Sequence, residues 1–246
     1  MHIQRISDIF MEIAKSLYYY GESSTEIEDS LFKIAKTYGL DVQVAAMGTV
    51  IHITLIAPKG ETISRIERVN DIDINFSKLE LWEQLIRRII NEKRPLYKVK
   101  KDIIKIKNIN EHTKTSIPLL IISVFIVSFS FCILFKGNFI DSIVSGISGV
   151  SSFIIIFKIK NRIFKDFMAG FLLHTFISIQ SIFFNINLFP SLAGALMVFV
   201  PGLLLTNGIL EIGERNLVSG GSKLLESMFI LGALVMGAIS SSIIWR

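Results

Sequence analysis

Five long apolar segments in the second half of the chain restrict its possible folds more than any other feature. They are Ile117–Phe135, Gly137–Phe157, Phe167–Phe189, Pro190–Leu210 and Ser227–Trp245. Asp141 is the single charged residue within these segments, and His174 is the single histidine. A bilayer core of about 30 Å needs about 20 mostly apolar residues in a helix, whose backbone groups are all paired internally. We therefore predict five transmembrane helices.

The first half of the chain has the composition of a soluble domain. Residues 1–114 contain 18 Lys and Arg and 16 Asp and Glu, whereas residues 115–246 contain only 8 and 5. Soluble domains carry charge on about a quarter of their residues. The predicted organisation is a cytoplasmic domain at 1–114, followed by a transmembrane domain at 115–246.

The distribution of basic residues predicts the orientation. Residues 86–114 hold ten Lys and Arg against three acidic residues, directly before the first apolar segment. The connections between segments two and three and between segments four and five are also basic, and cytoplasmic loops are enriched in Lys and Arg. We therefore expect a cytoplasmic N-terminus, an outer C-terminus and contact with the lipid bilayer. No nucleic-acid partner is expected, because no aromatic-interleaved basic face accompanies the charge.

Hydrophobic periodicity in residues 1–114 predicts a small α+β domain of order αα–βββ–αα. Two helices are expected before residue 40, the first ended by Gly21 and the second opened by a Ser23–Glu26 capping box. Alternating patterns over 40–47, 51–55 and 61–68 predict three strands. A second capping box, Ser77–Glu80, is expected to open the third helix, and a basic amphipathic helix at about 96–108 follows Pro95.

The most polar part of this domain is the motif that joins its first two helices. The residues of interest are Gly21, Ser23, Ser24, Glu26 and Glu28. Helix capping, with acidic residues favoured near a helix N-terminus, could account for all of them. The four histidines are far apart and Cys132 is the single cysteine, so we expect no metal site, no cofactor and no catalytic residues.

The fourth apolar segment contains the clearest candidate for a transport site. Pro201 and Gly202 interrupt it, and Thr206 and Asn207 follow. A Gly/Pro-interrupted span is the best sequence indication of a transporter's binding site, and a new helix N-terminus there could bind a carboxylate. A simple proline kink is the alternative.

Ionisable residues in or near the segments are candidates for proton coupling. His174 lies well inside a segment, where an ionisable group is costly and usually functional. Asp141, Asp166, Glu211 and Glu226 lie near segment ends, where solvated positions at the headgroups are the simpler interpretation. Small residues spaced by four in the second and fifth segments indicate close helix packing, either within the chain or against a partner.

Two motifs of the sequence resemble those of the threonine/serine exporter family. The Gly21–Glu28 segment looks like the signature that opens the soluble domain of this family. Val200–Gly202, Asn207–Gly208, Glu211 and Val218–Gly220 are similar, in this order, to its membrane signature. The chain departs from that signature at Glu211, where an aspartate is expected, and by an extra glycine, Gly221.

The resemblance implies the N-terminal half of a split exporter in the bacterial inner membrane. Its five segments would be completed by a second small membrane subunit, as in the two-component succinate exporters of the family. The substrate would be threonine, serine or a dicarboxylate. Pro201, Gly202, Thr206 and Asn207 would form the transport pathway, and Glu211 or His174 would couple protons. The alternative is a membrane-anchored sensor or enzyme that acts through its N-terminal domain.

Overall fold

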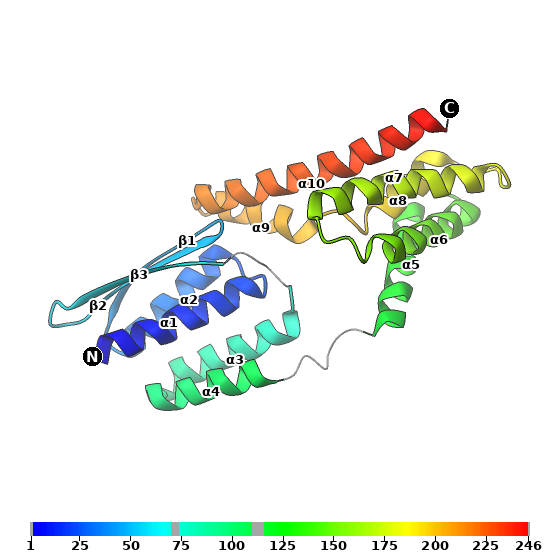
Figure 1. Cartoon of the computed structure of the whole chain (residues 1–246). Helices are drawn as coiled ribbons and strands as arrows, with labels where there is room; N and C mark the ends of the chain where they lie inside the picture. The colour runs from blue at the N-terminus through cyan, green and yellow to red at the C-terminus, as the bar shows by residue number, and fades with distance from the viewer. Residues whose placement is uncertain (1, 70–73, 110–115, 246) are drawn as a thin grey trace. The chain divides into compact units, whose positions relative to one another are not determined.

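The computed structural model describes residues 2–69, 74–109 and 116–245 (Figure 1). The described residues form two compact units. Unit 1 contains residues 1–111 and 206–223, and unit 2 contains residues 112–205 and 224–246. The expected boundary between residues 114 and 115 lies outside the described residues.

The N-terminal part of unit 1 has the predicted element order αα–βββ–αα. The helices of this part are α1 (His2–Tyr19), α2 (Ser24–Thr37), α3 (Phe76–Glu92) and α4 (Leu96–Asn108). Its strands are β1 (Asp41–Met47), β2 (Val50–Ile56) and β3 (Thr62–Arg68), which form an antiparallel sheet in that order. The three predicted strands are therefore confirmed. The prediction succeeded because alternating apolar residues are typical of a sheet with one buried face.

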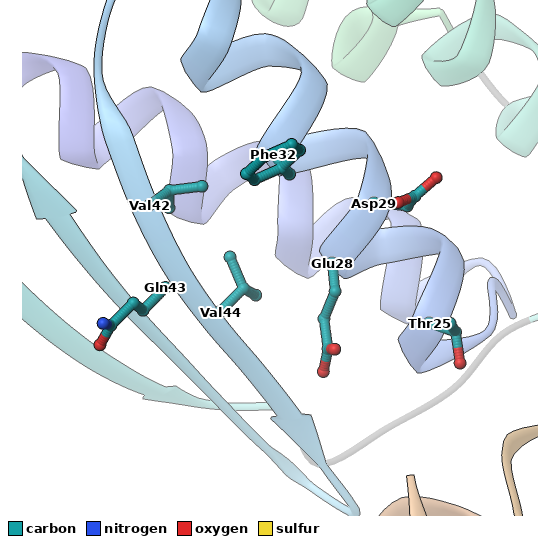
Figure 2. Close-up of a pocket in the computed structure, with 7 residues that line it drawn as sticks. All are labelled: Thr25, Glu28, Asp29, Phe32, Val42, Gln43 and Val44. Atoms are coloured by element: carbon teal, nitrogen blue, oxygen red, sulfur yellow. The ribbon is translucent and has the colours of Figure 1, made fainter. Parts of the chain in front are cut away.

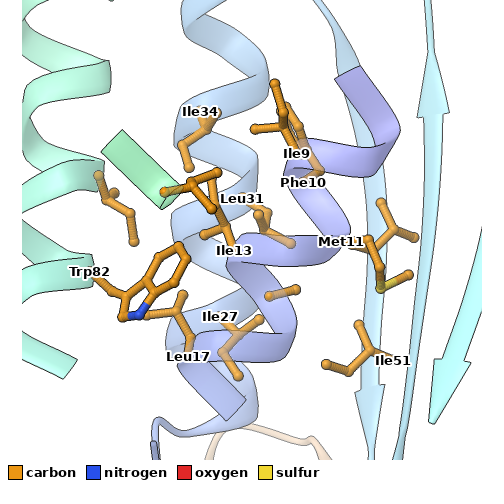
Figure 3. Packing of buried hydrophobic residues seen from close by; sticks show 14 of the residues in the cluster. Ile9, Phe10, Met11, Ile13, Leu17, Ile27, Leu31, Ile34, Ile51 and Trp82 are labelled. Carbon is orange, nitrogen blue, oxygen red and sulfur yellow. The ribbon is translucent and has the colours of Figure 1, made fainter. Parts of the chain in front are cut away.

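The core of unit 1 lies between the sheet and α1 and α2. Ile51, Ile53 and Leu55 project from β2 and are at most 1% exposed. Helices α1 and α2 cover this face, and α3 adds Trp82 to the same core (Figure 3). The apolar stripe predicted on the first helix is buried as expected: Ile6, Ile9, Phe10, Ile13 and Leu17.

Helix ends in unit 1 agree with the sequence in part. Gly21 has a φ of 99° just after α1, a conformation that glycine adopts without strain. Ser23 caps α2 by accepting from the Glu26 amide at 3.2 Å, but Glu22 rather than Glu26 accepts from the Ser23 amide. The capping box predicted at Ser77 is wrong: Asn75 caps α3, accepting from the Lys78 amide at 3.1 Å.

Three described helices are long and apolar enough to cross a membrane: α5 (Ile117–Leu134), α6 (Phe139–Ile156) and α10 (Leu217–Ile244). Helix α7 (Arg162–Ser181) has 20 residues but begins with a charged turn. The fourth apolar segment is divided into α8 (Leu188–Leu196) and α9 (Gly202–Gly213). The structure therefore supports three spanning helices and does not confirm five.

Small residues bring the helices of unit 2 close together. A Cβ added at Gly170 would lie 1.9 Å from the Leu234 carbonyl oxygen, and one at Gly237 would lie 2.0 Å from that of Phe167. These glycines therefore allow α7 and α10 to pack backbone against backbone. Gly146 and Gly149 of α6 instead make room for the side chains of Phe125 and Ser128 of α5. These small residues therefore pack against helices of the same chain, which is the first of the two interpretations given for them above, the other being contact with a partner.

Candidate functional site

The two sequence motifs meet within unit 1. The Ser24 backbone amide, in the first turn of α2, donates to Glu211 Oε1 of α9 at 2.7 Å. The hydroxyl oxygens of Ser24 and Ser219 lie 2.6 Å apart. Ser24, Glu211 and Ser219 are all 0% exposed. The soluble-domain motif therefore contacts the second half of the membrane motif, and we refer to the residues involved as the motif cluster: Ser24, Glu28, Glu211, Asn216, Ser219 and Lys223.

A buried ion pair lies at the centre of the motif cluster. Lys223 Nζ donates to Glu211 Oε1, and the Lys223 residue is only 6% exposed. The same ammonium lies 5.9 Å from the centroid of the Tyr18 ring, within range of a cation–π interaction. The carboxylate also lies at the N-terminus of α2, where the helix dipole favours negative charge. These contacts offset part of the desolvation cost of burying two charges.

One oxygen of the buried carboxylate is unpaired. Within the described residues, Glu211 Oε2 has no hydrogen-bond partner although it is buried. An unpaired buried acceptor is costly and requires an explanation.

Glu28 joins α2 to the sheet and to the connection between α9 and α10. Its Oε1 accepts from the Ala46 amide of β1 at 3.1 Å and from Asn216 Nδ2 at 3.4 Å. Burial raises the pKa of the Glu28 carboxyl above its usual range, and the negative charge of Glu211 adds to the increase. The hydrogen bonds from Ala46 and Asn216 act in the opposite direction.

A pocket of about 400 Å³ lies between α2 and β1, beside the motif cluster (Figure 2). Two carboxylates, of Glu28 and Asp29, contribute to its lining. The other lining residues are Thr25, Phe32, Val42, Gln43 and Val44. Asp29 is paired with Lys33 Nζ at 2.7 Å, which offsets part of the negative charge of this lining. The described residues contain no cluster of three His, Cys, Asp or Glu side chains that could hold a metal ion.

The predicted interruption of the fourth apolar segment coincides with a helix break. Helix α8 ends at Leu196, and α9 begins at Gly202, directly after Pro201. Thr206 and Asn207 follow on α9, where Thr206 is exposed and Asn207 is half-buried. The break thus separates two short helices within one apolar segment.

The two candidates for proton coupling belong to different units. His174 lies in unit 2, where its Nδ1 is 3.0 Å from Ser241 Oγ and 3.3 Å from Ser178 Oγ. Glu211 belongs to unit 1.

The other residues of the soluble-domain motif, Gly21, Ser23 and Glu26, lie at the N-terminal end of α2. Of these, Glu26 is exposed.

The interpretation of Asp141, Asp166 and Glu211 as solvated headgroup positions is wrong, because Asp141 and Glu211 are 0% exposed and Asp166 is 9% exposed. Asp141 forms a capping box with Asn138 and accepts from the Asn187 amide at 2.8 Å and from Asn187 Nδ2 at 3.0 Å. The spacing of Asn138 and Asp141 is that of a capping box and could have indicated this. No sequence spacing indicated Lys223 as the partner of Glu211.

A family model for threonine/serine exporters (ThrE) matches residues 8–245, nearly the whole chain. The chain belongs to the ThrE family. ThrE is a family of transporters and not of enzymes, and several apolar helices make this member a multi-pass membrane protein in contact with lipid. No curated protein and no solved structure matches the chain.

Proposed function

We propose that the chain is one subunit of an exporter that moves small carboxylate-bearing metabolites out of the bacterial cytoplasm. The substrates are threonine and serine, or a dicarboxylate such as succinate, and a second small membrane subunit completes the pathway. The observation that carries the proposal is the helix break between Leu196 and Gly202 in a member of an exporter family. Broken helices at membrane depth are tolerated where they line a cavity or are buried in protein.

The break provides chemistry that suits a carboxylate. Helix α9 begins at Gly202, and a helix N-terminus carries partial positive charge from its backbone N–H groups. Thr206 and Asn207, one turn further on, add a hydroxyl and an amide for hydrogen bonds to the substrate. Threonine, serine and succinate all carry a carboxylate that this helix end can bind.

In the proposed topology, the chain crosses the inner membrane five times, with its N-terminus in the cytoplasm. Helices α5, α6 and α7, the broken pair α8–α9, and α10 supply the five crossings. The basic residues that precede α5 support a cytoplasmic position for α1–α4. An odd number of crossings would place a second, inverted half beside the first, which is a common arrangement in transporters.

Glu211 is the proposed proton-coupling residue, with His174 as the second candidate. Protonation of Glu211 would remove its negative charge and weaken the ion pair with Lys223. The unpaired Oε2 atom is the position at which the proton would bind. The consequence would be a change in the contact between the start of α2 and the end of α9.

Efflux from loaded cells tests the proposal. Cells carrying labelled threonine, serine or succinate would express this chain alone, this chain with the small membrane protein encoded beside it, or neither. We expect faster efflux only with the pair, and the solute that moves would identify the substrate. Pro201→Ala should reduce efflux at equal membrane abundance, whereas Pro118→Ala, in the first turn of α5, should not. If no solute moved although both chains were inserted, a sensor or enzyme role of residues 1–114 would become the better explanation.

A further inference from the structure

A groove of about 1230 Å³ lies between α1 and α4 of unit 1. Ile9 of α1 and Ile103 of α4 line it and are at most 8% exposed. Tyr97 and Ile104 of α4 also line it and are 63% and 49% exposed. The groove therefore combines buried apolar walls with apolar side chains that remain accessible to a ligand.

The charges around the groove are unbalanced toward the positive. Two acidic residues line it, but Asp8 is paired with Arg65 at 2.6 Å and Glu12 is paired with Lys107. Arg5 and Lys100 line it as well and are exposed, and neither has an acidic partner among the residues that the structure describes. Two cations beside an apolar surface are thus available to an anionic ligand.

The outer surface of α4 has the same character. Lys98, Lys101 and Lys105 are exposed beside Tyr97 and Ile104, while Val99, Ile103 and Ile106 face the core. A helix with lysines around exposed aromatic and aliphatic side chains is typical of the membrane–water interface.

In the sequence, α4 is followed closely by the first apolar helix. Eight residues, 109–116, connect α4 to α5, the first helix that is apolar enough to cross a membrane. At no more than about 3.5 Å per residue, this connection spans at most roughly 30 Å. The cytoplasmic leaflet carries anionic lipids that attract basic segments next to a span.

We infer that the groove between α1 and α4 binds an anionic phospholipid, with its phosphate at Arg5 and Lys100 and its glycerol and upper acyl carbons against Tyr97 and Ile104. A soluble phosphate would use only the two cations and leave the apolar walls in water. A phospholipid uses both, and it is the anionic amphiphile that a short connection to a membrane helix makes available.

The test uses the full chain in lipid nanodiscs. Ile104→Cys, in a Cys132→Ala background, carries a fluorophore in the groove, and brominated phosphatidylglycerol or brominated phosphatidylcholine serves as the quencher. We expect stronger quenching by phosphatidylglycerol at equal lipid fraction. Arg5→Gln and Lys100→Gln should each weaken the apparent affinity about five-fold, the effect of about one basic residue near an anionic surface.

The controls separate this inference from its competitors. Lys59→Gln removes an exposed lysine from the turn before β3, away from the groove, and should leave quenching unchanged. Equal quenching by the two lipids, or no effect of Arg5→Gln and Lys100→Gln in variants with unchanged melting temperature, would overturn the inference. Full competition by soluble glycerol phosphate would assign the groove to free phosphates instead. None of these readouts depends on transport, so they stand apart from the efflux experiment.

Discussion

Glu211 and Lys223 are charged residues whose side chains lie out of water. Both are buried, and each depends on the other for charge compensation. A buried pair seldom stabilises a fold more than apolar residues of similar volume would, yet losing one partner is costly. The pair is therefore weak evidence for stability, but it fixes Glu211 against the start of α2.

Removing only one of these charges should destabilise unit 1 strongly. Glu211→Gln leaves Lys223 buried without a counter-charge, and we expect a loss of about 3–5 kcal/mol in the free energy of unfolding. Glu211→Gln combined with Lys223→Met should recover most of that loss, because no charge stays buried. The measurement is denaturation of the full chain followed by the fluorescence of Trp82, which is buried in unit 1. Equal losses in the single and double variants would argue against the pair as the cause.

Glu28 should make stability depend on pH. Because burial raises its pKa in the folded state, folding favours the protonated form. Its contribution is therefore fully favourable below the pKa of an unfolded glutamate and is lost as the pH rises through the raised, folded-state pKa.

The neutral variant Glu28→Gln removes this dependence and keeps an acceptor for the Ala46 amide. We expect the melting temperature of Glu28→Gln to match the wild type in acid and to exceed it at neutral pH. Glu61→Gln, at an exposed site before β3, serves as the control. A variant that is less stable than the wild type by the same margin at every pH would show that the hydrogen-bond geometry of the carboxylate matters more than its charge.

At the scale of elements, α9 and α10 are held together by close backbone contact inside unit 1. A Cβ added at Gly220 would lie 2.7 Å from the Gly208 carbonyl oxygen and 2.9 Å from the Ile212 amide nitrogen. Gly221, the next residue, has nothing within 4 Å of such a Cβ. The two neighbouring glycines therefore have different roles: only the first is needed for packing.

This difference gives a matched pair of variants. Gly220→Ala should destabilise the chain by about 1–3 kcal/mol through overpacking. Gly221→Ala should be neutral or stabilising by up to about 1 kcal/mol, because alanine favours the helix. Thermal unfolding of the purified full chain measures both. If the two variants behaved alike, the close approach of α10 to α9 would not be needed for stability.

At the scale of the whole molecule, the compact units do not follow the linear order of the chain. Residues 206–223 belong to unit 1 although they lie far from residues 1–111 in sequence. The hydrogen bond from Ser24 to Glu211 joins positions 187 residues apart. The contacts that Ser24 of the soluble-domain motif makes with Glu211 and Ser219 therefore form only when the end of α9 and the start of α10 are present.

Hydrogen exchange can test this dependence. In the full chain, the Ser24 amide should be protected, because it donates to a buried carboxylate at 2.7 Å. In a fragment of residues 1–111 the same amide should exchange rapidly, while amides in the middle of β2 should stay protected by the core. Equal protection of Ser24 in both samples would mean that Glu211 is not its main acceptor.

The sequence by itself determined the elements that depend on local periodicity. Alternating residues predicted the three strands, and the apolar stripe of α1 is buried as expected, because one face of each element must leave water. The long apolar segments predicted spanning helices, of which three are supported, and Pro201 marked the break before α9. The predicted cap at Ser77 was wrong by two residues, because Asn75 is an equally good capping residue.

Only the tertiary structure decided which polar groups are paired. Glu211 and Asp141 look in the sequence like solvated end residues, yet both are buried. Their burial depends on partners, Lys223 and Asn187, that no helical or strand spacing connects to them. A charge is stable out of water only where a counter-charge or donors already stand in position, and that position is set by how distant segments pack.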